Sequence, residues 1–152
     1  MSVGDRDPRP SWARARPDYP RVDIPGALVG VMRLKVLDRG MSLITPWTRA
    51  VRRFDVHELI VTDADAGPGD TVARCAYLGF AEFAAGGVAM SGDELWIDGA
   101  RIGTVAGFDE THMPNHQNIV IRGDALLTGL ERGLRLHAPI VLRAVYSGRA
   151  DG

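Results

Sequence analysis

The sequence is poor in cysteine, in lysine and in long apolar runs, and each shortage excludes a class of protein. Cys75 is the only cysteine among 152 residues, so the chain has no intramolecular disulfide and a cytoplasmic location is the default expectation. No apolar run approaches the roughly 20 residues of a membrane helix, and the first residues lack the apolar segment of a secretory signal. We therefore expect no membrane partner.

A strong charge of either sign is also missing. The formal net charge is −1, and Lys35 is the only lysine, with arginine supplying the other positive charges. Nucleic-acid binding would need a basic stripe interleaved with aromatic residues, and the sequence has none. The charge balance therefore excludes nucleic acid as the expected partner and favours a small-molecule substrate.

The first 20 residues differ in composition from the rest of the chain. Residues 1–20 are rich in arginine, proline and aspartate, a composition that buries too little apolar surface to order itself. We expect a flexible arm there, a single β domain over residues 21–148, and a short tail over 149–152. Trp12 and Tyr19 favour an alternative in which the arm wraps a neighbouring subunit and holds a homo-oligomer together.

What the chain does contain is a series of short apolar segments separated by turn residues. Eighteen glycines and scarce helical periodicity are typical of a mostly β fold, a small antiparallel β-barrel or barrel-like sandwich. Residues 124–133 begin with aspartate and end with glycine, which predicts one short helix or a pair of turns. The expected strands are 27–37, 72–83, 94–97, 101–108, 118–122 and 140–146, with an apolar stretch at 54–61 and an irregular crossing or edge strand at 42–48.

Two glycine positions carry specific expectations. Asp98-Gly99 lies between two short apolar segments and predicts a two-residue hairpin turn, because both residues tolerate positive φ. Gly79 interrupts the long segment 72–83 and predicts a bend or bulge there.

The polar loop within residues 107–121 gathers more proton-transferring groups than any other stretch. Unperturbed histidine titrates near pH 6.5, so His112 and His116 are expected to act as acid or base without unusual tuning. A neighbouring carboxylate, Asp109 or Glu110, would raise the pKa of an imidazole and fix its tautomer. We expect these four residues at the open end of the barrel, where a ligand enters.

The same loop could instead hold a divalent metal such as zinc. No cofactor is required for acid–base chemistry, but His112 and His116 have the spacing of paired zinc ligands, and His57 could supply a third imidazole. Pro114 lies between the first two and disfavours the helix that such spacing normally needs. Without a ligand of either kind, the two loop histidines would be solvated side chains, and His57 would be a polar surface residue at the start of a strand.

Five further residues are expected to contact a ligand. Asn115 and Asn118 would hydrogen-bond a carbonyl group or a developing oxyanion. Tyr77 and Cys75 share a face of one strand, although a lone cysteine is more often a small core residue than a nucleophile. Arg122 would bind a carboxylate or phosphate if it pointed inward, together with another strand arginine. Pointing outward, it would only keep the strand soluble.

Glu82 is the remaining candidate acid. It falls on the opposite face of its strand from Cys75 and Tyr77 unless a bulge at Gly79 brings it back. A buried Glu82 would have a raised pKa and would be a candidate general acid. The alternative is an outward glutamate on a solvated face.

The spacing of the expected strands and turns in the second half is similar to that of a known family. The segments that carry this spacing are Glu94-Leu-Trp-Ile-Asp-Gly-Ala-Arg-Ile-Gly-Thr-Val-Ala-Gly-Phe, Asn118-Ile-Val-Ile-Arg-Gly-Asp and Ile140-Val-Leu-Arg. Residues 69–146 resemble the sorbitol/glucitol-specific IIA component of the bacterial sugar phosphotransferase system, a small β-barrel protein. This half also looks like uncharacterised actinobacterial proteins built around the Gly-Phe-Asp-Glu-Thr-His-Met-Pro-Asn-His loop.

The resemblance implies the barrel but not the activity. The family carries its phosphoryl group on a histidine in the strand that corresponds to about residues 72–80. Here that strand reads Ala73-Arg74-Cys75-Ala76-Tyr77 and has no histidine. The family's phosphohistidine chemistry is therefore not expected in this chain.

Three functions follow from these observations. The first is a small β-barrel enzyme without a redox cofactor, a lyase, isomerase or cyclase that acts on a small polar metabolite, in a setting such as bacterial specialised metabolism. The second is a non-catalytic carrier or ligand-binding module that resembles the phosphotransferase component. The third is a structural subunit whose arm docks a partner.

Overall fold

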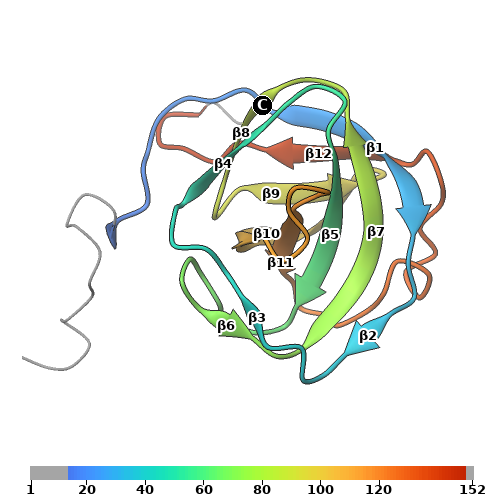
Figure 1. Cartoon of the computed structure of the whole chain (residues 1–152). Helices are drawn as coiled ribbons and strands as arrows, with labels where there is room; N and C mark the ends of the chain where they lie inside the picture. Colours follow the sequence, from blue (N-terminus) through green and yellow to red (C-terminus); the bar gives the residue numbers. More distant parts are fainter. Residues whose placement is uncertain (1–13, 150–152) are drawn as a thin grey trace, which may run out of the picture.

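The computed structural model describes residues 14–149, whose regular structure consists of twelve β-strands (Figure 1). Residues 1–13 of the predicted arm and 150–152 of the predicted tail lie outside the described residues. The strands are β1 (Ile24–Val31), β2 (Lys35–Val36), β3 (Met41–Ser42), β4 (Thr48–Val51), β5 (Val56–Thr62), β6 (Thr71–Val72), β7 (Cys75–Phe83), β8 (Gly87–Met90), β9 (Glu94–Ile97), β10 (Ala100–Asp109), β11 (Asn118–Arg122) and β12 (Pro139–Arg143). The mostly β class predicted from the sequence is confirmed.

Seven strands form a closed ring of backbone hydrogen bonds. Their order is β1-β12-β9-β10-β11-β5-β7, and β7 pairs back with β1. Only the β11–β5 pair is parallel among these, and the other pairs are antiparallel. Two short pairs, β3–β6 and β4–β8, lie beside the ring (Figure 1). Closure leaves no long unpaired edge among these seven strands.

The main core fills the interior of the ring. Every ring strand contributes to it, and the largest side chains are fully buried. They include Leu28, Leu59, Leu78, Phe83, Leu95, Phe108 and Ile119. Because side chains alternate along a strand, the ring strands send every second residue inward except at the bulges of β7 and β10.

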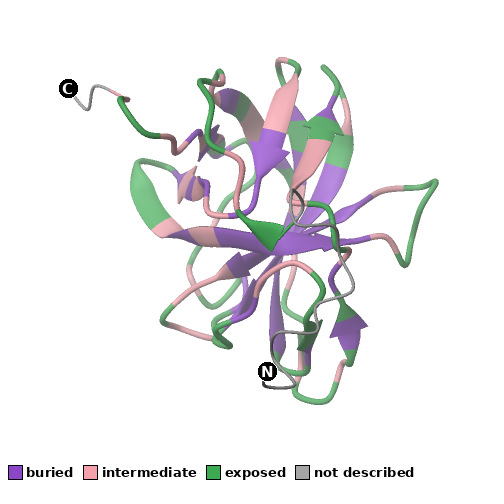
Figure 2. Ribbon diagram, turned by 90° about the vertical axis from the view of Figure 1, so that its left-hand side faces the viewer, coloured by how far each residue is buried: buried purple, intermediate pink, exposed green. Residues whose placement is uncertain are grey.

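A second core covers the outer face of part of the ring. Ile60, Tyr77 and Val120 point outward from β5, β7 and β11, and they pack under Met41 and Val72 of the β3–β6 pair. As a result β5 is buried on both faces from its second residue to its last. Figure 2 shows that buried residues lie mainly on the strands and exposed residues mainly on the loops. This double burial explains why β5 is a nearly continuous apolar run rather than an alternating one.

Both glycine predictions are confirmed. Asp98 and Gly99 have φ values of 53° and 79° and connect β9 to β10 as a tight hairpin. The register between β5 and β7 shifts beside Gly79, which has a φ of 153°. A Cβ at Gly79 would collide with the carbonyl oxygen of Gly30, so the glycine also lets β1 approach closely.

Turns, not a helix, occupy residues 124–133. Thr128 and Glu131 exchange side-chain to backbone hydrogen bonds of 3.0 and 3.1 Å, as at the start of a helix, but Gly133 ends the turn with a φ of 70°. The amide of Gly129 donates to the carbonyl of Tyr77, so this segment bonds to β7 instead of extending a helix. The prediction of a pair of turns is therefore correct, and that of a short helix is wrong.

A buried ion pair connects the segment before β1 to the turn between β8 and β9. Arg21 donates to both carboxylate oxygens of Asp93, at 2.6 and 2.8 Å, and both side chains are at most 4% exposed. Asp93 also accepts from the amides of Met90 and Val145. Arg16, from the end of the predicted arm, donates to the carbonyl of Ser91 at 2.6 Å.

Arg21→Ala should destabilise the protein by about 3–5 kcal/mol, because it leaves the buried Asp93 carboxylate without its main partner. Equilibrium unfolding in urea measures the change. Arg52→Ala is the matched control, since Arg52 is 88% exposed in its ion pair with Asp55 and should cost less than about 1 kcal/mol. Equal losses in the two variants would contradict the assigned role of Arg21.

Candidate functional site

Three adjacent strands place polar side chains in one row on the outer face of the ring. Glu58 of β5 is in register with Asn118 of β11, which is in register with Asp109 of β10. Residues in register on neighbouring strands point to the same face, so the three side chains lie side by side. All three are at least 95% buried, and we call them the polar row.

Hydrogen bonds hold one end of the polar row. Asn118 Nδ2 donates to Asp109 Oδ1 at 2.9 Å. The Thr111 hydroxyl donates to Asp109 Oδ2 at 2.9 Å, and the Thr111 amide donates to Oδ1. Asn118 Oδ1 is buried without a hydrogen-bond partner among the described residues. Asp109 therefore anchors the start of the polar loop.

Arg39 supplies the positive charge near the polar row. Its Nε donates to the Tyr77 hydroxyl at 3.2 Å, and this bond raises the pKa of Arg39. The same guanidinium interacts electrostatically with Glu58 and Asp109. Burial raises the pKa of Tyr77 and raises that of Cys75 to about 11, so the Cys75 thiol stays protonated at neutral pH. Cys75 is thus a small core residue, the role that its sequence context favoured.

Glu58 faces His116 at the other end of the row. Glu58 Oε1 lies 3.6 Å from His116 Nε2, and the two side chains are 6% and 13% exposed. Burial raises the pKa of Glu58 to about 7, and the charge of Arg39 opposes that rise. Burial, with the charges of His112 and His57, lowers the pKa of His116. The pKa of a carboxylic acid normally lies below that of an imidazole. In this pair the difference between the two pKa values is therefore narrowed or reversed.

Contacts with β7 and within the loop surround the ring of His116. The ring stands edge-on to Phe80, with centroids 5.0 Å apart, and lies 5.1 Å from the ring of His112. Its Nδ1 is 3.1 Å from Asn115 Oδ1. The loop forms a turn at Pro114 rather than a helix, as that proline predicts.

The loop and β4 enclose a cavity of about 370 Å³ beside this pair. Both His116 and His57 line it, and the arginines Arg49 and Arg52 bring positive charge to its wall. Asp55 is the only carboxylate among its lining residues within the described chain. Arg49 is held at 3.1 Å by Glu110, whose side chain is 37% exposed.

His57 forms a second imidazole–carboxylate pair on the cavity wall. The amide of Gln117 donates to His57 Nδ1 at 3.0 Å, so Nδ1 is an acceptor and the neutral ring carries its proton on Nε2. Nε2 lies 3.5 Å from Asp55 Oδ2, and the His57 side chain is 11% exposed, so it is not a solvated surface residue. Burial lowers the pKa of His57, which keeps the ring neutral near pH 7.

The structure brings some of the predicted site residues together and separates others. His116, Asp109, Asn118, Tyr77 and Cys75 share the outer face of the ring. His112 and Asn115 are exposed on the loop but both contact the ring of His116, and Glu110 pairs with Arg49 of the cavity wall.

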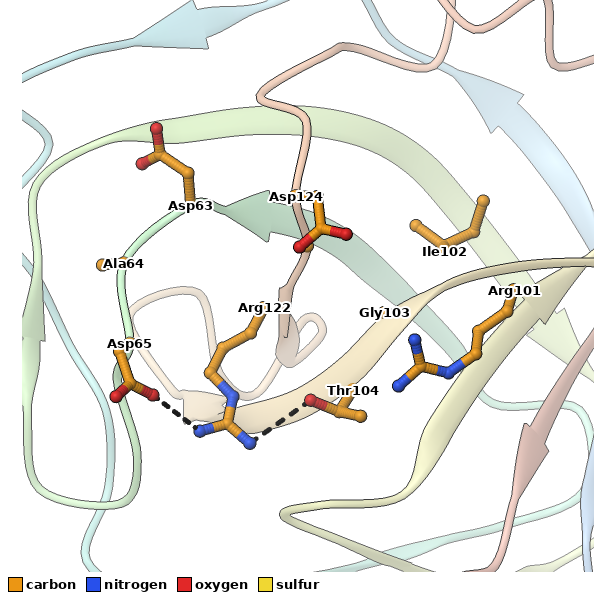
Figure 3. Close-up of a pocket in the computed structure, with 10 residues that line it drawn as sticks. Asp63, Ala64, Asp65, Arg101, Ile102, Gly103, Thr104, Arg122 and Asp124 are labelled. Atoms are coloured by element: carbon orange, nitrogen blue, oxygen red, sulfur yellow. Dashed lines mark hydrogen bonds and ion pairs between the residues drawn. The ribbon is translucent and has the colours of Figure 1, made fainter.

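Two predicted residues lie elsewhere. The bulge at Gly79 turns Glu82 to the same face as Tyr77, but Glu82 is exposed, so it is the outward glutamate of the alternative expectation and not a buried acid. Arg122 points outward at the far end of β11, where it lines a different pocket (Figure 3). Neither residue lines the cavity of His116.

The site residues that sequence reasoning missed are Glu58, Arg39, Asp55 and Gln117. Glu58 stood next to a recognised histidine in the sequence, but nothing local indicated that a second layer of chain would bury it. Arg39 lies in a turn and reaches Tyr77 only through the fold. The one local signal was the unbroken apolar run after Glu58, which is typical of a strand covered on both faces.

A metal site has little support from the geometry. Within residues 14–149, no group of three or more His, Cys, Asp or Glu side chains stands in position to hold a metal ion. The divalent metal at His57, His112 and His116 therefore stays a prediction. Nor does this part of the chain contain a helix long and apolar enough to cross a membrane.

Comparison with known proteins adds a family but not an activity. No curated protein and no solved structure matches the chain significantly. A model of a family of unknown function, DUF6917, matches residues 18–143, which include every strand of the ring and both histidine–carboxylate pairs. The chain belongs to this family, DUF6917.

Proposed function

We propose that the chain is a small β-barrel enzyme that performs acid–base chemistry on a small anionic metabolite without a redox cofactor. The ring of strands is the barrel, and the cavity beside His116 is the active site. The observation that carries the proposal is the buried contact between Glu58 and His116 at the wall of that cavity. The reaction class is a lyase, isomerase or cyclase, since these need only positioned proton transfer.

His116 is the group that exchanges a proton with substrate. Its Nε2 is buried against Glu58, whereas Nδ1 lies 3.1 Å from Oδ1 of Asn115, an exposed residue of the cavity wall. When Glu58 is ionised, its charge favours the tautomer that keeps the proton on Nε2, which leaves the Nδ1 lone pair as a base. When Glu58 is protonated, it donates to Nε2, and Nδ1 carries the proton as an acid. Glu58 thus selects the tautomer of the imidazole.

The proton balance of the pair suits catalysis near neutral pH. With its pKa raised to about 7, Glu58 is close to half ionised there. His116, with a lowered pKa, is mostly neutral. Abstraction of a substrate proton by Nδ1 moves the Nε2 proton toward Glu58, so no net charge accumulates in the buried pair. General acid–base catalysis works best when the pKa lies near the working pH.

The charge of the cavity wall selects the substrate. Arg49 and Arg52 supply two positive charges against the single carboxylate of Asp55. The Arg49–Glu110 pair is partly exposed, and such pairs contribute little, so an anion can replace Glu110 at Arg49. A small carboxylate with an acidic C–H bond next to it fits both the arginines and the base.

His116→Ala should lower catalysed proton exchange by about 10²–10⁴-fold, the usual contribution of a positioned acid or base. The assay incubates the protein in D₂O with a panel of 2-oxo and 3-oxo carboxylic acids and follows loss of the C–H signals by NMR. His137→Asn is the control, because His137 is an exposed residue with a φ of 68°, which asparagine tolerates.

Two outcomes would contradict the proposal. Exchange in His116→Ala at the wild-type rate would exclude His116 as the base. Saturable binding of the same acids without any exchange would favour a non-catalytic carrier or ligand-binding module instead.

Glu58→Gln should flatten the dependence of stability on pH. The pKa of Glu58 rises from 4.5 to about 7 on folding, so its contribution is complete below about pH 4.5 and is lost as the pH rises through 7. Relative to the variant, the wild-type free energy of unfolding should fall by on the order of 1–3 kcal/mol between pH 5 and pH 8. Urea unfolding across this range measures it.

Glu110→Gln provides the matched control for that measurement. Glu110 lies in the same loop region but is 37% exposed, so its substitution should leave the wild-type slope nearly unchanged. A wild-type slope that Glu58→Gln does not alter would mean that Glu58 ionises without hindrance in the folded protein.

A further inference from the structure

We propose that the pocket between Arg101 and Arg122 is a second ligand site, which binds the zwitterionic head of a free α-amino acid. The pocket has a volume of about 280 Å³ and lies on the outer face of the ring, lined by β10, the end of β11 and the loop after β5. None of the residues of the polar row or the cavity of His116 lines it. The site is therefore independent of the proposed catalytic site.

Strand geometry holds the two arginines in place. Thr104 is in register with Arg122, and Arg101 lies three residues before Thr104 on β10. Between them, a Cβ at Gly103 would collide with the carbonyl oxygen of Arg122, so the glycine lets the two strands approach closely. Figure 3 shows the two guanidinium groups on either side of Thr104. Groups mounted on paired strands are positioned more rigidly than groups on loops.

Arg122 already holds a carboxylate that a ligand can replace. Its Nη1 lies 3.1 Å from Asp65 Oδ1, and its Nη2 donates to the Thr104 hydroxyl at 3.3 Å. The Asp65 side chain is 99% exposed, so its ion pair with Arg122 contributes little stability. The Asp65 carboxylate therefore marks the position of a ligand carboxylate, and it can swing into solvent when one arrives.

Arg101 adds a second cation on the same side of the pocket. Its Nε donates to Glu94 at 3.2 Å, and 48% of its side chain is exposed, so this ion pair contributes little stability and a ligand can compete for the guanidinium. Two guanidinium groups and a hydroxyl are a typical set of partners for one carboxylate.

The acidic residues of the pocket select a ligand with a positive group. Asp63 and Asp124 lie on the wall, and Asp63 is paired at 3.2 Å with Arg74, which lies outside the pocket. Asp124 has no side-chain partner among the described residues, and its carboxylate faces the hollow in Figure 3. A simple anion would be repelled by it, whereas an ammonium group beside the ligand carboxylate would pair with it. A zwitterion can pair with the arginines through its carboxylate and with Asp124 through its ammonium group.

The test uses the whole chain and NMR titration of its backbone amides. The common L-amino acids are screened first, and the tightest binder is then compared with the same molecule lacking the amine or lacking the carboxylate. For L-valine these are isovalerate and isobutylamine. We expect saturable shifts at the amides of Gly103, Thr104 and Gly123. The molecule that lacks the amine and the molecule that lacks the carboxylate should each bind at least about ten-fold more weakly than the amino acid.

Substitutions then locate the site. Arg122→Gln and Asp124→Asn should each weaken amino-acid binding by about ten-fold or more. Arg135→Gln is the control, since Arg135 is 78% exposed in its ion pair with Asp98 and neither residue lines the pocket, and it should bind as the wild type does.

Three results would overturn the proposal. They are the absence of a saturable shift at those amides with every amino acid, equal affinity for the amino acid and its deaminated half, and unchanged binding by Asp124→Asn. None of them bears on exchange catalysed by His116, so the two proposals fail separately.

Discussion

The double burial of β5 and its neighbours is the constraint on which the candidate site depends. The inner face of these strands packs in the ring, and the outer face lies under the chain around Met41 and Val72. Any polar side chain on that outer face must leave water and needs partners, because an unsatisfied buried polar group is costly. Glu58, Asn118 and Asp109 are in that position, and their contacts follow from it.

Desolvation shifts the pKa values of Glu58 and His116 in opposite directions. It penalises the charged form of both, so it raises the pKa of Glu58 and lowers that of His116. A solvated glutamate and histidine would instead form an ion pair over most of the pH range between their ordinary values. The cover over the outer face therefore brings the pKa values of two ordinary groups close together or reverses their order. Arg39 limits this effect by adding a positive charge beside Glu58.

The two pockets differ in the balance of their charges, and this difference separates their expected ligands. The cavity of His116 has mainly positive walls and two imidazoles. The pocket of Arg122 has both signs in close proximity and no histidine. They lie at opposite ends of β11, which runs from Asn118 in the polar row to Arg122. A single rigid strand thus connects them.

Local pattern in the sequence determined the mostly β class, the Asp98-Gly99 hairpin, the bulge at Gly79 and the polar loop, because each depends on residues a few positions apart. It also indicated His116, Asp109 and Asn118 as site residues. Only the tertiary structure decided that Glu58 is buried, that Arg39 reaches Tyr77, and that Glu82 and Arg122 lie away from the cavity. Those outcomes depend on strand register and on cover by distant segments. Such long-range contacts set the solvent exposure of a side chain, and through it the pKa, which no local pattern encodes.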